Sequence, residues 1–231
     1  MQVGNITINQ LFYQPRRYVV PLYQRPYIWQ QQIQWEPLWE DIRTVAERLI
    51  DNANAHLHFL GAIVLEYVPQ HTGAMQIRLV IDGQQRLTTI QLLLEALYDY
   101  CGYIGATKLH QAVEMMVRND DPLSTNPIEC YKVWPTNVDR SHFQRVMEAK
   151  SPDELKQMYE KPVKAKQLGH SITDAYLYFS DTIAEWAEED LEQREARLRA
   201  LILAIRDQVG LVVIDVEKGD ETALNARKFI Y

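Results

Sequence analysis

The sequence contains few cysteines and fewer basic than acidic residues, and each of these features excludes some classes of protein. Its 231 residues include two cysteines, Cys101 and Cys130. They make neither a disulfide framework nor a metal-binding pattern, and they favour a reducing, cytoplasmic setting. The formal net charge of −7 argues against binding nucleic acid by bulk electrostatics, although a local basic patch stays compatible with it.

Targeting and membrane signals are missing as well. Met1 to Asn5 lack a basic segment followed by an apolar core, and no apolar run approaches the roughly 20 residues of a membrane span. We therefore expect no membrane partner. No internal repeat, low-complexity segment or P-loop is visible. With 47% hydrophobic and 24% charged residues, the composition fits a globular protein of one large domain or two small ones.

The most informative stretch spans residues 77–100. An apolar, β-branched run ends at Asp82 and Gly83, and apolar residues at helical spacing follow from Leu87. Asp82 suits a helix N-cap, and Gly83 allows a tight turn. Free N–H groups and the dipole at a helix N-terminus favour an anion. Arg86, in the first turn, would oppose that dipole unless an anion or a carboxylate lies nearby.

Two interpretations of this turn stay open from the residues alone. In the first, Asp82 and Gly83 form a plain strand-to-helix turn and Arg86 is a solvated charge, which is the commoner case for an isolated Asp-Gly-x-x-Arg. In the second, the turn is an anion site.

A second polar and aromatic stretch spans residues 16–29. Residues 18–22 predict a strand, and Pro21 marks its edge or its exit. Arginine suits bidentate phosphate contacts, and aromatic rings suit stacking on a base. An ordinary loop with aromatic anchors in the core is the alternative, and it is favoured for Tyr27 and Trp29 taken alone.

The rest of the chain alternates helical and strand patterns. Gly61, within a strand at 58–67, indicates a close backbone approach, and a turn at 70–73 predicts a hairpin. His56 and His58 fit a satisfied or exposed pair better than a metal site. The predicted helices cover 33–52, 86–100, 108–118, 140–149, 168–187 and 197–206, another begins at 151–152, and a strand at 210–216 belongs inside a sheet.

Several separated motifs point to a family. Set in order, they are Val20 to Trp29, Leu38 to Ile42, His58 to Gly61, Ile81 to Thr89, Trp134 to Arg140 and Ala175 to Phe179. Together they resemble the N-terminal domain of GmrSD-type, modification-dependent (type IV) restriction enzymes. The same domain occurs in related phage-defence proteins that sense phosphorothioated DNA. The resemblance covers nearly the whole chain.

The resemblance implies an α+β fold of the ParB and sulfiredoxin type. It consists of a small mixed sheet with a phosphate site at the Asp-Gly-x-x-Arg strand-to-helix turn, followed by a mainly helical region. On this chain the nucleotide-binding core would cover residues 1–105. The helical region would cover 106–231, with a late strand near 210–216 returning to the sheet.

The resemblance also implies binding and hydrolysis of a nucleoside triphosphate, which would regulate DNA cleavage by a nuclease domain. The Asp-Gly-Gln-Gln-Arg signature assigns catalysis to Asp82, Gln84, Gln85 and Arg86. Asp82 would orient water or hold Mg²⁺, and a glutamine would position the attacking water. Nucleotide binding is expected at Tyr23, Gln24, Arg25, Gly83, Arg86 and Thr88.

The sequence departs from the family in two places. It ends at Ala226 to Tyr231, where the family continues, which suggests a piece of a larger protein. No His-Asn-His-type arrangement is present, so the nuclease would be a C-terminal or separate partner domain.

Two other functions remain open. A binding module without turnover would recognise modified DNA or respond to nucleotide. Its phosphate contacts would be Arg16, Arg17 and Arg25, and its stacking platform Tyr23, Tyr27 or Trp29. A scaffold would use the long helices at 170–208 for assembly, for instance as a homo-oligomer.

Overall fold

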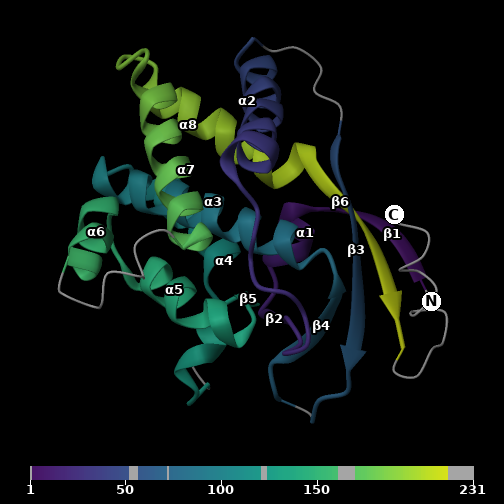
Figure 1. Cartoon of the computed structure of the whole chain (residues 1–231). Coiled ribbons are helices and arrows are strands. Elements are labelled where there is room, and N and C mark those ends of the chain that lie inside the picture. Colours follow the sequence, from purple (N-terminus) through teal and green to yellow (C-terminus); the bar gives the residue numbers. More distant parts are fainter. Residues whose placement is uncertain (1, 52–56, 72, 121–123, 161–169, 218–231) are drawn as a thin grey trace.

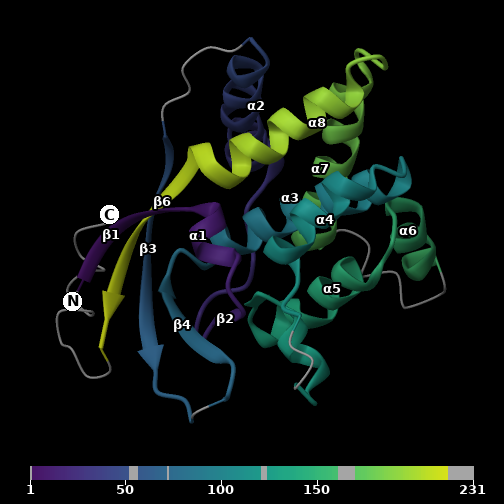
Figure 2. The same ribbon diagram turned by 180° about the vertical axis from the view of Figure 1, so that it is seen from behind.

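A computed structural model describes residues 2–51, 57–71, 73–120, 124–160 and 170–217. They form a six-stranded mixed sheet and a larger helical part, so the predicted α+β class is confirmed. In both views the helices gather on one side of the molecule, and β1, β3 and β6 lie on the other (Figures 1 and 2). His56 and the predicted chain-end segment 226–231 lie outside the described residues.

The strands are β1 (Gln2–Thr7), β2 (Arg16–Val19), β3 (His58–Val68), β4 (Gln76–Asp82), β5 (Val133–Trp134) and β6 (Val209–Val216). The α-helices are α1 (Ile8–Phe12), α2 (Glu36–Ile50), α3 (Gln84–Tyr103), α4 (Thr107–Val117), α5 (Asn137–Glu148), α6 (Pro152–Glu160), α7 (Ser171–Glu188) and α8 (Arg194–Leu203). Shorter helical turns are η1 (Gln31–Trp35), η2 (Pro127–Cys130) and η3 (Ala204–Gln208).

The strand order is β1-β6-β3-β4-β2-β5. The predicted hairpin is confirmed, because β3 and β4 pair antiparallel. The predicted late strand is also confirmed: β6 lies inside the sheet, antiparallel to β1 and parallel to β3. Strand β2 runs parallel to β4, so both point their C-terminal ends toward the start of α3.

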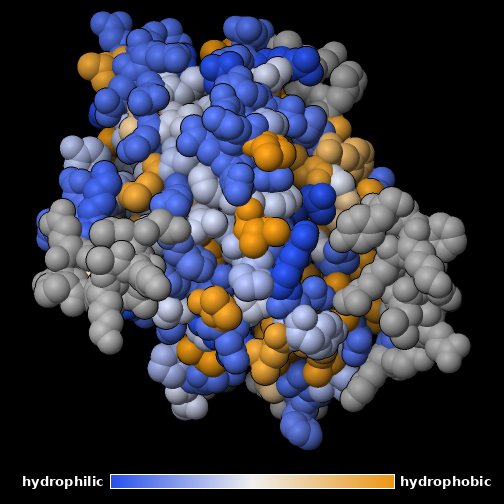
Figure 3. Space-filling view, viewed as in Figure 1, coloured by the Kyte–Doolittle hydropathy of each residue, from blue (hydrophilic) through white to orange (hydrophobic). Residues whose placement is uncertain are grey.

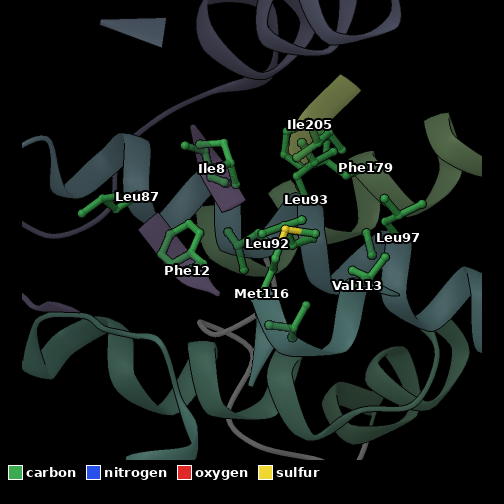
Figure 4. Packing of buried hydrophobic residues seen from close by; sticks show 14 of the residues in the cluster. Ile8, Phe12, Leu87, Leu92, Leu93, Leu97, Val113, Met116, Phe179 and Ile205 are labelled. Carbon is green, nitrogen blue, oxygen red and sulfur yellow. The ribbon is translucent and has the colours of Figure 1, made fainter. Parts of the chain in front are cut away.

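Helix α3 runs through the hydrophobic core. It is buried on almost every side because it packs against α4 and α7. Figure 4 shows Leu93 of α3 among side chains from other elements, including Phe12 of α1 and Phe179 of α7. One hydrophobic cluster therefore contains side chains from both sides of the predicted domain boundary near residue 105. Among the described residues, no helix is long and apolar enough to cross a membrane.

Two local predictions were wrong. The N-cap of α3 is Gly83, at φ +91°, because Asp82 still pairs with Val64 in the sheet. Strand β2 ends at Val19 and does not reach residue 22, since Pro21 has no N–H to continue the ladder.

Candidate functional site

A cleft of about 570 Å³ lies where β4 gives way to α3. It brings together the two stretches that the sequence analysis singled out, since residues near 25 face residues near 84. Its lining comprises Tyr23, Gln24, Arg25, Trp29, Ile81, Asp82, Gly83, Gln84, Gln85 and Arg86.

Gly83 creates the turn at the base of this cleft. A Cβ atom added to Gly83 would lie 2.5 Å from Ile63 Cγ2, and the φ of +91° disfavours other residues. Helix α3 begins there without a side-chain cap, and its first backbone bond runs from Leu87 N to Gly83 O. The preceding N–H groups, at positions 84–86, therefore have no acceptor within the helix. This N-terminus is suited to an anion.

The Arg86 side chain, from the first turn of α3, contacts β3 where the pairing of β3 with β6 is irregular. Its Nη1 donates to Ala62 O at 2.7 Å, and a Cβ added to Gly61 would lie 3.0 Å from Nη2. Gly61 has a φ of +102°, and the pairing of β3 with β6 is irregular next to it. The close approach at Gly61 is thus made by the Arg86 guanidinium and not, as predicted, by backbone. Burial lowers the pKa of the half-buried Arg86 guanidinium, and the charge of Asp82 opposes this.

Glutamine side chains hold the loop that faces α3. Gln24 Nε2 donates to Ile81 O, and Gln84 Nε2 donates to Arg25 O, each at 2.9 Å. Gln85 makes two such bonds: its Nε2 donates to Pro26 O at 2.9 Å, and its Oε1 accepts from Ile28 N at 2.8 Å. Both polar atoms of the Gln85 amide are therefore engaged by loop backbone, which fixes the loop against the helix start.

The cleft residues coincide with the two most specific motifs of the sequence, and a comparison of the whole chain agrees. The model of the family described as "GmrSD restriction endonuclease, N-terminal domain" matches residues 8–230. The chain belongs to this family. As a GmrSD N-terminal domain, it is a component of a restriction system. No curated protein matches the chain.

Most site residues predicted for this GmrSD N-terminal domain line the one cleft. Tyr23 is 71% exposed and Arg25 is exposed, both on the loop, and Trp29 is half-buried. Thr88 is an exception: it is 2% exposed on the packed side of α3, so its hydroxyl does not reach the cleft. The structure thus does not bring Thr88 together with the other predicted nucleotide-binding residues, and its role in the site stays a prediction.

Tyr27 does not offer a stacking face. It is 5% exposed, and its hydroxyl bonds to Thr89 Oγ1 at 2.6 Å and accepts from Trp35 Nε1 at 2.9 Å. These contacts use Tyr27 as an anchor of the loop in the core. The ordinary-loop alternative therefore applies to Tyr27.

Arg16 and Arg17 lie away from the cleft. Arg16 pairs with Gln76, at the opposite end of β4 from Asp82, which is about 20 Å at the usual strand rise. Its Nε donates to the Gln76 side chain. Arg17 is 5% exposed, with its guanidinium 5.7 Å from the centre of the Trp134 ring. Arg16 and Arg17 therefore do not share the cleft with Arg25, and their contact with DNA phosphates stays a prediction.

The potential metal ligands of the described residues do not form a cluster. Within the described ranges, no group of three or more His, Cys, Asp or Glu side chains could hold a metal ion. His58 Nε2 instead faces Asp41 Oδ2 at 3.2 Å. Asp82 supplies the carboxylate in the cleft lining.

A further residue near the loop was missed by the sequence analysis. Asp139 of α5 is 2% exposed, and its Oδ2 accepts from Tyr27 N at 3.0 Å. It belongs to the Trp134 to Arg140 motif that contributed to the family resemblance. An acid in the first turn of a helix usually indicates only a favourable dipole interaction, so this signal did not mark it as part of the site.

Proposed function

We propose that this chain binds a nucleoside triphosphate in the cleft, hydrolyses it and thereby regulates DNA cleavage by a nuclease domain. One observation carries the proposal: Arg25, Arg86, Asp82 and the uncapped N-terminus of α3 converge on one cleft. Phosphoryl transfer depends chiefly on positioning and on stabilising charge, which such a set of groups supplies.

The phosphates would lie at the start of α3, held by backbone N–H groups and by Arg86. Arg86 is restrained by its hydrogen bond to Ala62 O, so its side chain loses little conformational entropy when it binds an anion. Arg25, exposed on the facing loop, would close on the phosphates from the other side.

Asp82 is the group that fits Mg²⁺. This ion commonly uses one or two carboxylates, several waters and the phosphates of the substrate, so a single carboxylate in the cleft is compatible with it. When bound, the ion would neutralise phosphate charge.

Gln84 and Gln85 receive a different role from the one expected from the family signature. Their amides bond to the loop backbone, so we assign them to positioning the loop that carries Arg25. Orienting the attacking water then falls to Asp82.

The base would contact the aromatic side chains of the loop. Tyr23 and Trp29 line the cleft from the loop that carries Arg25, whereas Arg86 lines it from α3. The face shown in Figure 3 carries scattered apolar side chains among polar ones, without one broad apolar area. A cleft lined by Arg25, Asp82 and Arg86 as well as by Tyr23 and Trp29 favours a charged ligand that carries a ring.

The test is phosphate release by the purified chain with Mg²⁺ and each common nucleoside triphosphate. Wild-type protein should release phosphate, and Asp82→Asn and Arg86→Ala should each lose that activity. Equal turnover in all three proteins would contradict the assignment.

A switch that binds nucleotide without turnover is the second candidate. It is favoured by the engagement of Gln85 at both polar atoms, which leaves fewer groups to orient water. A rise in melting temperature with nucleotide but without phosphate release would support it. Salt-dependent binding to modified but not to plain DNA would instead support a DNA-sensing module.

A further inference from the structure

Asp139, in the first turn of α5, contacts the backbone of the cleft loop. Its Oδ2 accepts hydrogen bonds from Tyr27 N at 3.0 Å and from Thr136 Oγ1 at 2.6 Å. The carboxylate is 2% exposed, and a bond from an N–H to a charged oxygen is stronger than a neutral one.

This bond completes a continuous set along the loop backbone. The carbonyls of Arg25 and Pro26 accept from Gln84 and Gln85, and Ile28 N donates to Gln85. Pro26 has no N–H, so the remaining backbone N–H between Arg25 and Ile28 is that of Tyr27. Asp139 accepts a hydrogen bond from it. Three of these four hydrogen bonds are made by side chains of α3, and the fourth is made by Asp139 of α5.

The other oxygen of Asp139 faces α7. Asp139 Oδ1 lies 3.4 Å from His170 Nε2, and His170 Nδ1 accepts from Ile172 N at the start of α7. Because Nδ1 is an acceptor, the proton of a neutral His170 ring is on Nε2. Asp139 Oδ1 nevertheless makes no hydrogen bond in the described structure, so its contact with His170 is one of proximity. The His170 ring also stacks on His142 of α5 at 3.9 Å.

We propose that Asp139 is a positioning residue for the triphosphate site. It fixes the backbone that carries the exposed Arg25 and lies close to the N-terminus of α7. The inference rests on the proposed function, because a loop position matters for activity when Arg25 contacts the phosphates.

The experiment compares Asp139→Ala, Asp139→Asn and Asp99→Ala with wild type. Asp99 is the matched control, since it is also buried and accepts a bond from the Tyr176 hydroxyl at 2.6 Å. Among the described residues it has no hydrogen bond to the loop. Asp139→Ala should raise KM for nucleotide about ten-fold with a smaller change in kcat, since one charged hydrogen bond is lost. Asp139→Asn keeps an oxygen acceptor and should restore KM. Asp99→Ala should lower the melting temperature and leave KM unchanged.

Equal increases of KM in Asp139→Ala and Asp99→Ala would overturn the proposal, because they would indicate general destabilisation. A KM in Asp139→Asn as high as in Asp139→Ala would overturn it too. Failure of the proposed function is recognised separately, as a wild-type melting temperature that no nucleotide changes.

Hydrogen exchange tests the anchor without activity, and it applies even if Asp139→Ala does not fold. The Tyr27 amide should exchange slowly in wild type and in Asp139→Asn. An unprotected Tyr27 amide in wild type would overturn the proposal.

Discussion

The two ends of the β2–β4 pair both carry positive charge, but they use it differently. At the end next to α3, Arg86 bonds to one carbonyl and shares the cleft with the exposed Arg25. At the other end, Arg16 bonds to Gln76, and Arg17 is buried against Trp134. A ligand site thus depends on what surrounds an arginine more than on how many arginines a motif contains.

Backbone geometry explains the difference. The cleft end has an uncapped helix and two glycines at positive φ, Gly61 and Gly83, which let backbone and guanidinium approach closely. At the other end, the Arg17 guanidinium lies 5.7 Å from the ring of Trp134, which belongs to the neighbouring parallel strand β5. The following predictions test this contrast, from the largest expected effect to the smallest.

The largest effect should come from Arg86→Ala. We expect nucleotide turnover to fall on the order of 10²–10³-fold, as for loss of one charge-stabilising donor. Arg16→Ala, at the other end of the sheet, is the control and should keep turnover within about two-fold. Similar losses in steady-state phosphate release for the two variants would remove the contrast.

Gly61→Ala should destabilise the fold and also disturb the cleft. The left-handed backbone conformation alone costs about 1–3 kcal/mol, and the new methyl would press on Arg86. Denaturant unfolding and nucleotide titration measure the two consequences.

Gly105→Ala is the matched control for Gly61→Ala, since Gly105 also has a positive φ, +71°, but has open space around its Cβ position. It should lose stability but retain nucleotide affinity. Retained affinity in Gly61→Ala would show that Arg86 does not depend on this close approach.

Lys132→Met should change how stability varies with pH. Burial, with a contribution from Arg16, lowers the pKa of Lys132 to about 8 in the folded chain. The unfolded chain therefore binds this proton more tightly, and the wild type loses stability as pH falls from about 10.5 to 8. The free energy of unfolding of Lys132→Met, minus that of wild type, should be larger at pH 7.5 than at pH 9.5. Nucleotide binding should not change. Parallel melting temperatures of the two proteins across this range would contradict the shift.

Arg17→Met should have the smallest effect. Arg17 Nε and Nη2 are buried without a hydrogen-bond partner in the described structure, so an apolar side chain of similar length loses little. We expect the free energy of unfolding to stay within about 1 kcal/mol and nucleotide affinity to be unchanged. A large loss of nucleotide affinity would show that Arg17 contributes to a ligand site.

The strand-to-helix corner could be predicted because its signals are local. A β-branched run, Asp82-Gly83 and a helical repeat lie within 77–97, and the hairpin before it has a turn of its own. The meeting of this corner with the loop near Arg25 came from the family resemblance, since no local pattern specifies a contact between separate segments.

Burial of individual polar side chains could not be predicted in the same way. Arg17 lies beside Trp134, and Tyr27 is held by Trp35 and Thr89, which are contacts of tertiary structure. Asp139 was missed for the same reason, because its partner Tyr27 is 112 residues away. Composition and periodicity indicate which face of an element is apolar, but not which distant element covers it.

The most direct measurement is a crystal structure of the chain with Mg²⁺ and a non-hydrolysable nucleoside triphosphate. The account predicts phosphate oxygens about 3 Å from the N–H groups that begin α3 and from the Arg86 guanidinium. Phosphates bound elsewhere on the chain, or a cleft left empty at saturating nucleotide, would contradict it.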